Sequence, residues 1–147
     1  AEIQNLSDHL RAGKTMVCFP EGTSSAGLTV LPFKSTLFAS FFEDQDGLSD
    51  IVIQPFTTVL TDIDGRAPSS PDSRDLYAWH GDADLLPHLW AFAKTSGAGL
   101  RLIFHPPLHA RNFADRKALA AACYALASGP LAAEKTGNSL DKSTQAA

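Results

Sequence analysis

The order of helix-forming and strand-forming segments is the feature that most limits how this chain can fold. The expected helices cover 2–12, 33–43, 84–96 and 114–127, and the expected strands cover 15–19, 51–60 and 100–104. The helices are indicated by apolar residues at helical spacing, and the strands by short apolar or β-branched runs. Alternation of this kind is typical of α/β folds. We therefore predict an α/β fold with a largely parallel sheet covered by helices.

Length and charge set the class of protein. The chain has 147 residues, of which 44% are hydrophobic, which suits one domain with its own core. The formal net charge of −4 argues against nucleic acid as a partner. We expect residues 1–132 to form the folded part. Residues 133–147 have few large apolar side chains, which predicts a disordered tail.

The two cysteines, two of the histidines and Asp84 are expected to have structural rather than functional roles. We expect Cys18 and Cys123 to be buried free thiols. His105 and His109 flank two prolines after an expected strand, which predicts exposed imidazoles. Asp84 is expected to cap the helix that follows it rather than to bind a metal ion. None of these groups predicts a metal site.

The segment from Phe19 to Lys34 carries the clearest indication of function. It contains Phe19-Pro20-Glu21-Gly22-Thr23-Ser24-Ser25 and Leu31-Pro32-Phe33-Lys34-Ser35. Hydroxyls and backbone N–H groups between a strand and a helix can hold an anion, and Lys34 adds a positive charge. Glu21 is unfavourable beside an anion unless it accepts hydrogen bonds. An ordinary strand-to-helix loop with a solvated glutamate is the alternative, and Walker A spacing is absent.

The same residues resemble the third sequence block of the lysophospholipid acyltransferase family, which includes bacterial 1-acylglycerol-3-phosphate acyltransferases. Ile53-Gln54-Pro55-Phe56 resembles the fourth block, and the likeness extends over roughly residues 2–127. It implies a glycerolipid acyltransferase-like fold. The implied reaction moves a fatty acyl group from acyl-CoA or acyl carrier protein to the hydroxyl of a lysolipid in phospholipid biosynthesis. No cofactor is implied.

The resemblance also implies roles and a location. It assigns acceptor binding to Glu21, Gly22, Thr23, Ser24 and Lys34, and the floor of the site to Pro55. It places the protein at a membrane surface, on the cytoplasmic face of the inner membrane.

One position departs from the family in a way that concerns the acceptor. Ser24 stands where the family usually has an arginine, which would pair a phosphate through two hydrogen bonds. Lys34 or Arg66 could compensate for its loss. Alternatively, the acceptor has no phosphate there, as in a lyso-ornithine lipid. The sequence leaves both explanations open.

The family's catalytic His-x4-Asp motif, in which histidine is the general base, is the second departure. None of the five histidines is followed by aspartate at that spacing. We therefore expect no catalytic residue in this chain and interpret it as the C-terminal portion of an acyltransferase domain. A non-catalytic lipid-binding fragment or pseudoenzyme is the alternative, and a small anion-binding or nucleotide-binding α/β protein is a weaker one.

Overall fold

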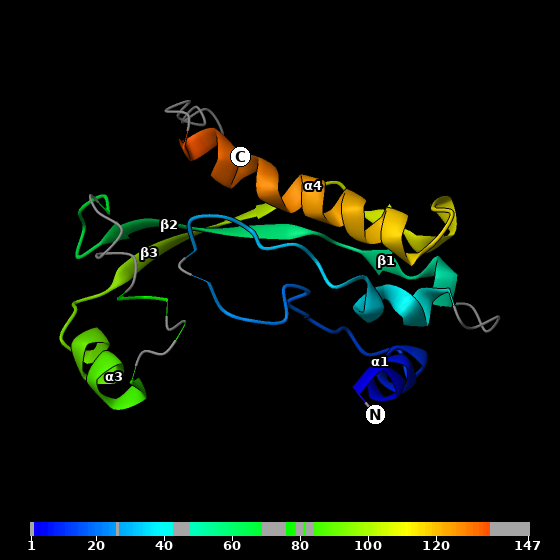
Figure 1. Ribbon diagram of the computed structural model, residues 1–147, viewed down its shortest axis with the longest axis horizontal. Helices are drawn as coiled ribbons and strands as arrows, with labels where there is room; N and C mark the ends of the chain where they lie inside the picture. Colours follow the sequence, from blue (N-terminus) through cyan, green and yellow to red (C-terminus); the bar gives the residue numbers. More distant parts are fainter. Residues whose placement is uncertain are drawn as a thin grey trace.

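The computed structural model describes residues 2–25, 27–42, 48–68, 76–78, 81 and 84–135. A long helix lies along a two-stranded ladder, with small helical segments at both ends (Figure 1). The elements are α1 (Glu2–Arg11), η1 (Ser35–Phe41), η2 (Leu48–Asp50), β1 (Val52–Ile53), β2 (Phe56–Ile63), α3 (Leu85–Ala93), β3 (Ala98–Phe104), β4 (Leu108–His109), η3 (Ala110–Asn112) and α4 (Arg116–Lys135).

The described strands form two antiparallel pairs. β2 pairs with β3 from Phe56 opposite Phe104 to Ile63 opposite Ala98, and β1 pairs with β4. The predicted strand over 51–60 is divided at Pro55, because proline has no N–H to donate to a ladder. Parallel pairing was expected but is not found among the described strands. A largely parallel sheet therefore stays a prediction for the complete domain.

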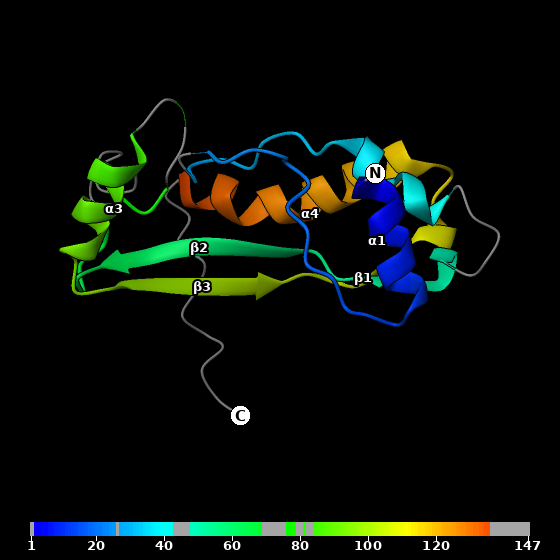
Figure 2. The same cartoon turned by 90° about the horizontal axis from the view of Figure 1, so that it is seen from below.

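The core lies where α4 packs on η1 and on one face of the β2–β3 ladder (Figure 2). Leu119, Cys123 and Ala127 are buried and follow each other at four-residue spacing along one side of α4. Phe38 of η1 packs against this side. Asp115 fixes the start of α4, since its Oδ1 accepts hydrogen bonds from the backbone N–H groups of residues 117 and 118, both at 2.8 Å.

Three predictions about secondary-structure elements were wrong. Residues 14–19 form no strand and Val17 is 65% exposed, because an apolar run becomes a strand only when a neighbour completes its hydrogen bonds. The predicted helix over 33–43 is the shorter 3-10 helix η1. The helix predicted to end before Gly129-Pro130 continues to Lys135, and Leu131 just beyond Pro130 is buried, so packing offsets the missing hydrogen bond. Residues 136–147 of the predicted tail lie outside the described residues.

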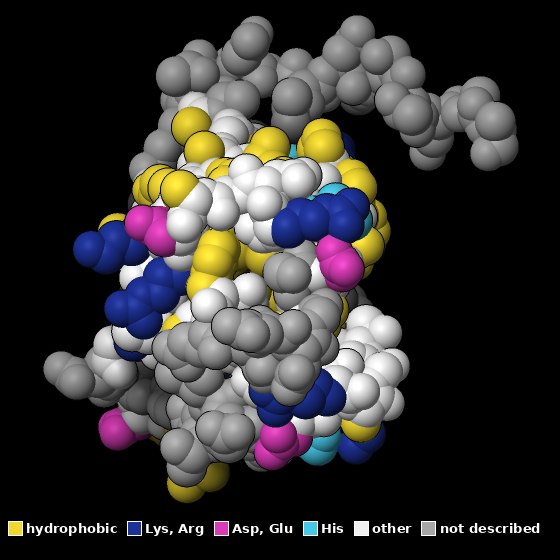
Figure 3. Space-filling view, turned by 90° about the vertical axis from the view of Figure 1, so that its right-hand side faces the viewer, with side chains coloured by type: hydrophobic (Ala, Val, Ile, Leu, Met, Phe, Trp, Pro, Cys, Tyr) yellow, Lys and Arg dark blue, Asp and Glu magenta, His cyan; other side chains and the backbone are white. Residues whose placement is uncertain are grey.

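Charged side chains are dispersed at the end of the molecule that carries α1. Figure 3 shows the described lysines and arginines of this face in separate groups, with acidic and hydrophobic side chains between them. This distribution is consistent with the net charge of −4.

Candidate functional site

The loop that follows residues 14–19 is closed by backbone hydrogen bonds at its two ends. The N–H of Gly22 donates to the carbonyl of Phe19 at 3.1 Å, and the N–H of Lys34 donates to the carbonyl of Pro20 at 2.8 Å. Glu21 adds a third bond, because its Oε2 accepts from the N–H of Leu31 at 2.7 Å. The loop itself therefore supplies the hydrogen-bond donor that Glu21 needs.

Gly22 and Lys34 are in close contact. Gly22 has φ +68°, in the left-handed region that favours glycine. A Cβ at this position would lie 2.6 Å from Lys34 Nζ and 2.8 Å from its Cε. The lysine side chain therefore crosses directly over Gly22, which follows Glu21 in the chain.

The remaining predicted acceptor residues lie at the exposed part of the loop. Thr23 and Ser24 are both exposed, and Ser25 Oγ accepts from the N–H of Gly27 at 3.3 Å. Arg66, which was considered as a substitute for the missing arginine, bridges Ile63 beyond the far end of β2 and does not line the pocket. Of the two cations considered for that role, the structure places Lys34 at the loop. Among the predicted site residues, Glu21 and Pro55 line the pocket described next, whereas Gly22, Thr23, Ser24 and Lys34 do not.

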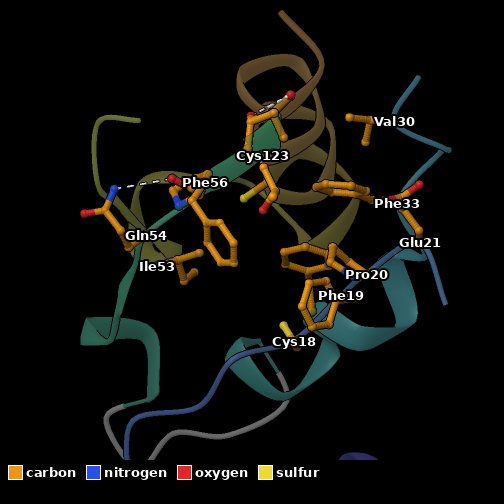
Figure 4. A pocket seen from close by; sticks show the side chains of 15 residues that line it. Cys18, Phe19, Pro20, Glu21, Val30, Phe33, Ile53, Gln54, Phe56 and Cys123 are labelled. Carbon is orange, nitrogen blue, oxygen red and sulfur yellow. Dashed lines mark hydrogen bonds between the residues drawn. The ribbon is translucent and has the colours of Figure 1, made fainter. Parts of the chain in front are cut away.

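A pocket of about 230 Å³ opens between this loop, η1, the start of β2 and α4. Its larger hydrophobic side chains are Phe19, Val30, Phe33, Phe38, Ile53 and Phe56. Figure 4 shows the rings of Phe19 and Phe33 on one side and that of Phe56 on the other. Glu21 is one of the few charged or polar side chains in the wall. The pocket thus offers an apolar space with a carboxylate at its edge, which suits an amphiphilic ligand.

Pro55, to which the family resemblance assigns the floor of the site, is buried and lines the pocket opposite the loop. It lies in the bend between β1 and β2, and its carbonyl accepts a hydrogen bond from the N–H of His105 at 3.0 Å. The side-chain amide of Gln54 donates to the carbonyl of His105. It also lies 3.4 Å from the carbonyl of Pro55 (Figure 4). Gln54 and Pro55 thereby fasten the wall of the pocket to the segment after β3.

Thr57 and His105 form a polar connection that the sequence did not predict. The hydroxyl of Thr57 donates to the carbonyl of Ala127 at 2.8 Å and lies 2.8 Å from His105 Nε2. Because a hydroxyl has one hydrogen, it must accept its second bond, so Nε2 of His105 carries the proton. His105 was expected to be exposed, but it is half-buried. A polar threonine two residues after Pro55 in an apolar run was the available signal.

The two cysteines differ in exposure although both line the pocket. Cys123 is buried, as predicted, whereas Cys18 is exposed because the strand predicted to bury it does not form. The pKa of the Cys123 thiol is raised from 9.0 to about 11, mainly by burial and then by the nearby Cys18, while a backbone hydrogen bond acts in the opposite direction. Cys123 is therefore a neutral, inert thiol at physiological pH.

The described residues contain neither a cluster of metal ligands nor a membrane-spanning helix. Within 2–135, leaving out the gaps given above, no group of three or more His, Cys, Asp or Glu side chains is placed to hold a metal ion. In the same part of the chain, no helix is both long and apolar enough to cross a bilayer.

Comparison with known proteins shows which enzymes this chain is similar to. Over 122 residues, the chain is 43% identical to a lyso-ornithine lipid O-acyltransferase of Rhodobacter capsulatus. The matched region covers 82% of the chain and 41% of that enzyme. This chain is related to bacterial O-acyltransferases. Enzymes of the same name from Brucella abortus and Rhizobium meliloti are 34% and 30% identical over 121 and 118 residues. These matches cover 81% and 79% of the chain, and 45% and 40% of the two enzymes.

The chain spans less than half the length of these curated relatives. No family model matches it, and no solved structure matches it. The relationship to lysolipid acyltransferases agrees with the resemblance of the Glu21 and Pro55 blocks, and the names of the relatives correspond to the phosphate-free alternative raised by Ser24.

Proposed function

We propose that this chain forms the acceptor-binding part of an enzyme that transfers a fatty acyl group to the hydroxyl of a lysolipid. The 43% identity to a lyso-ornithine lipid O-acyltransferase is the observation that carries the proposal. The pocket of about 230 Å³ beside Glu21 supports it, because an apolar space with a charged edge fits a lipid with a polar headgroup. Acyl-CoA or acyl carrier protein is the proposed donor, and a membrane surface supplies the acceptor, on the cytoplasmic face of the inner membrane.

An ornithine-bearing lysolipid fits the charges at the loop better than a phosphate-bearing one. Ornithine carries amine and carboxylate groups and no phosphate. The Glu21 carboxylate uses Oε2 for the loop, and Oε1 has no partner among the described residues, so it can accept from an ammonium group. Lys34, crossing Gly22 nearby, can pair with a carboxylate. Ser24 leaves no guanidinium at the position where the resembled family holds a phosphate.

The reaction needs a general base that this chain does not provide through the family's motif. We propose that a histidine outside these residues removes the proton from the acceptor hydroxyl as that oxygen attacks the thioester carbonyl. The thiolate of the donor then leaves as the tetrahedral intermediate collapses. Glu21, Gly22, Thr23, Ser24 and Lys34 position the acceptor headgroup, and Pro55 forms the floor of the pocket beneath it.

Two substitutions at Glu21 separate its structural bond from its charge. Glu21→Gln keeps an oxygen that can accept from Leu31 N–H but removes the negative charge, whereas Glu21→Ala removes both. In the full-length protein, we expect Glu21→Gln to raise KM for lyso-ornithine lipid about tenfold with unchanged folding, since a hydrogen bond between charged groups contributes about 1.5–3 kcal/mol. Glu21→Ala should also lower the stability of the loop. Steady-state acyl transfer, with circular dichroism as the folding control, measures both effects.

An unchanged KM in Glu21→Gln would mean that the Glu21 carboxylate takes no part in acceptor binding. A non-catalytic lipid-binding protein is the second candidate, since the apolar pocket beside Glu21 would serve lipid binding alone equally well. Under that alternative, full-length protein would bind lysolipid in the pocket but show no transfer of a radiolabelled acyl group from either donor.

A further inference from the structure

Thr57 is a buried polar residue at the interface between β2 and α4. It is 4% exposed and lies on the same face of the strand as Val59, which is also buried. α4 runs along this part of the ladder (Figure 2). A buried hydroxyl is unfavourable unless its hydrogen bonds are made. Thr57 makes two, and they join β2, α4 and the segment after β3 in one connection, the His105–Thr57–Ala127 bridge.

The bridge has a fixed direction. The single hydrogen of the Thr57 hydroxyl is donated to the carbonyl of Ala127, so the N–H of His105 Nε2 donates to the same oxygen, each over 2.8 Å. The imidazole thus holds the hydroxyl from one side and directs its hydrogen toward α4 on the other. His105 is itself fixed through its backbone, because its N–H donates to the carbonyl of Pro55 and its carbonyl accepts from the side chain of Gln54.

The bridge reaches α4 at a turn that its own sequence interrupts. Pro130 lies inside the helix and has no N–H to donate to the carbonyl of Leu126, four residues earlier. Ala127 follows Leu126 directly, so it belongs to the turn in which backbone hydrogen bonding is incomplete. Proline in a helix normally bends it at this place. The Thr57 hydroxyl supplies a donor to the interrupted turn from the strand, which holds α4 against β2.

The same residues form one part of the pocket wall. Thr57 and Ala127 both line the pocket, and so does Cys123, one turn earlier on α4 (Figure 4). His105 is not among the lining residues, but Pro55, whose carbonyl it binds, is one of them. The imidazole therefore acts on the pocket from behind its wall: it determines how α4 lies on β2 without contacting a ligand.

From these observations we infer that His105 and Thr57 are positioning residues of the acceptor site, which keep α4 at the separation from β2 that fits the hydrocarbon part of the lysolipid. The inference rests on the proposed function, which supplies the ligand of the pocket. Loss of the bridge should weaken acceptor binding and leave the chemical step unchanged, because neither residue touches the reacting atoms.

Two pairs of substitutions in the full-length protein test the inference by kinetics. Thr57→Val and His105→Leu remove the hydroxyl and the N–H of the bridge, whereas Thr57→Ser and His105→Gln retain a donor at each place. We expect the first pair to raise KM for lyso-ornithine lipid about fivefold or more, with kcat and KM for the acyl donor within about twofold. The second pair should keep KM for the lysolipid within about twofold of the wild-type value. The double variant Thr57→Val/His105→Leu should raise KM no further than the larger single change, because both remove the same connection.

Asp115→Ala is the matched control on the same helix. It removes two hydrogen bonds from the first turn of α4, and Asp115 does not line the pocket. It should lower the stability of the helix but change KM for the lysolipid less than about twofold. If Thr57→Val changes KM no more than Asp115→Ala or Thr57→Ser does, the inference is overturned.

The reactivity of Cys123 measures the position of α4 without a substrate. Its thiol lines the pocket and is 3% exposed, so its alkylation by N-ethylmaleimide, followed by mass spectrometry of the peptide that contains it, reports how readily α4 separates from β2. Thr57→Val should raise the alkylation rate about tenfold or more above that of Asp115→Ala. Equal rates in the two variants would contradict the inference. A wild-type protein that transfers no acyl group would instead contradict the proposed function, and the alkylation rates distinguish the two failures because they need neither lysolipid nor acyl donor.

Discussion

The carboxylate of Glu21 divides two tasks between its oxygens. Oε2 holds the loop together through Leu31 N–H, and under the proposed function Oε1 binds the acceptor. The need for a donor at Glu21 could be predicted from residue types alone, because an acid in an anion-binding loop is otherwise unfavourable. The identity of that donor could not be predicted, since it depends on how residues 21 and 31 meet across the loop.

Gly22 and Gly27 allow the contact with Lys34 to be tested separately from backbone strain. Their φ angles are +68° and +69°, but a Cβ at Gly27 would meet nothing within 4 Å, whereas one at Gly22 would meet the lysine side chain. We expect both alanine variants to lose about 1 kcal/mol of unfolding free energy, because a left-handed conformation is unfavourable for alanine. Only Gly22→Ala should displace Lys34 and raise KM for the acceptor about fivefold or more, since charge-assisted hydrogen bonds contribute about 1.5–3 kcal/mol.

Urea unfolding and steady-state kinetics of the two variants provide the comparison. Equal KM values in Gly22→Ala and Gly27→Ala would mean that the position of Lys34 over Gly22 has no part in acceptor binding.

At the scale of elements, α4 and β2 determine where the pocket lies, and the loop closes it. The helical spacing of apolar residues on α4 was visible in the sequence, and so was the interruption at Pro55. Strand pairing was not visible, because an apolar run specifies a tendency to be extended but not its neighbour. The run at 15–19 therefore suggested a buried strand, although the structure leaves Val17 and Phe19 largely exposed. The same limit applies to the antiparallel pairing of β2 with β3, which periodicity does not indicate.

The buried thiol of α4 predicts how this packing depends on pH. The folded pKa of Cys123 is about 11 and its ordinary value is 9.0, so the folded state keeps this proton to higher pH. The contribution to stability is complete below pH 9 and is lost as pH rises through 11. Between pH 8 and 11, the chain should lose roughly 2 kcal/mol more unfolding free energy than its Cys123→Ala variant.

Urea titrations of both proteins in a reducing buffer measure this difference. Lysines and tyrosines also titrate in this range, but they are common to both proteins and cancel in the comparison. Parallel pH profiles for the two proteins would show that Cys123 has no raised pKa and that the α4 side of the pocket is hydrated.

At the scale of the whole molecule, large hydrophobic side chains are exposed in several places. Two of them are helix α3, with Leu86 and Trp90, and the face of β3 that carries Leu100, Leu102 and Phe104. α4 covers the opposite face of the ladder (Figure 2), and these three β3 side chains are 63%, 54% and 67% exposed. The sequence predicted the composition of both surfaces but not their exposure, because periodicity identifies an apolar face without showing what covers it.

The central claim is that this chain binds the acceptor of a lysolipid acyltransferase and that Ser24 belongs to a site without a phosphate. Acyl transfer by the full-length protein to lyso-ornithine lipid and to lysophosphatidic acid, in wild-type and Ser24→Arg forms, measures it most directly. The account predicts a preference for lyso-ornithine lipid of about tenfold or more in kcat/KM, reduced in Ser24→Arg because a guanidinium can pair with phosphate. Equal or faster transfer to lysophosphatidic acid by the wild-type protein would contradict it.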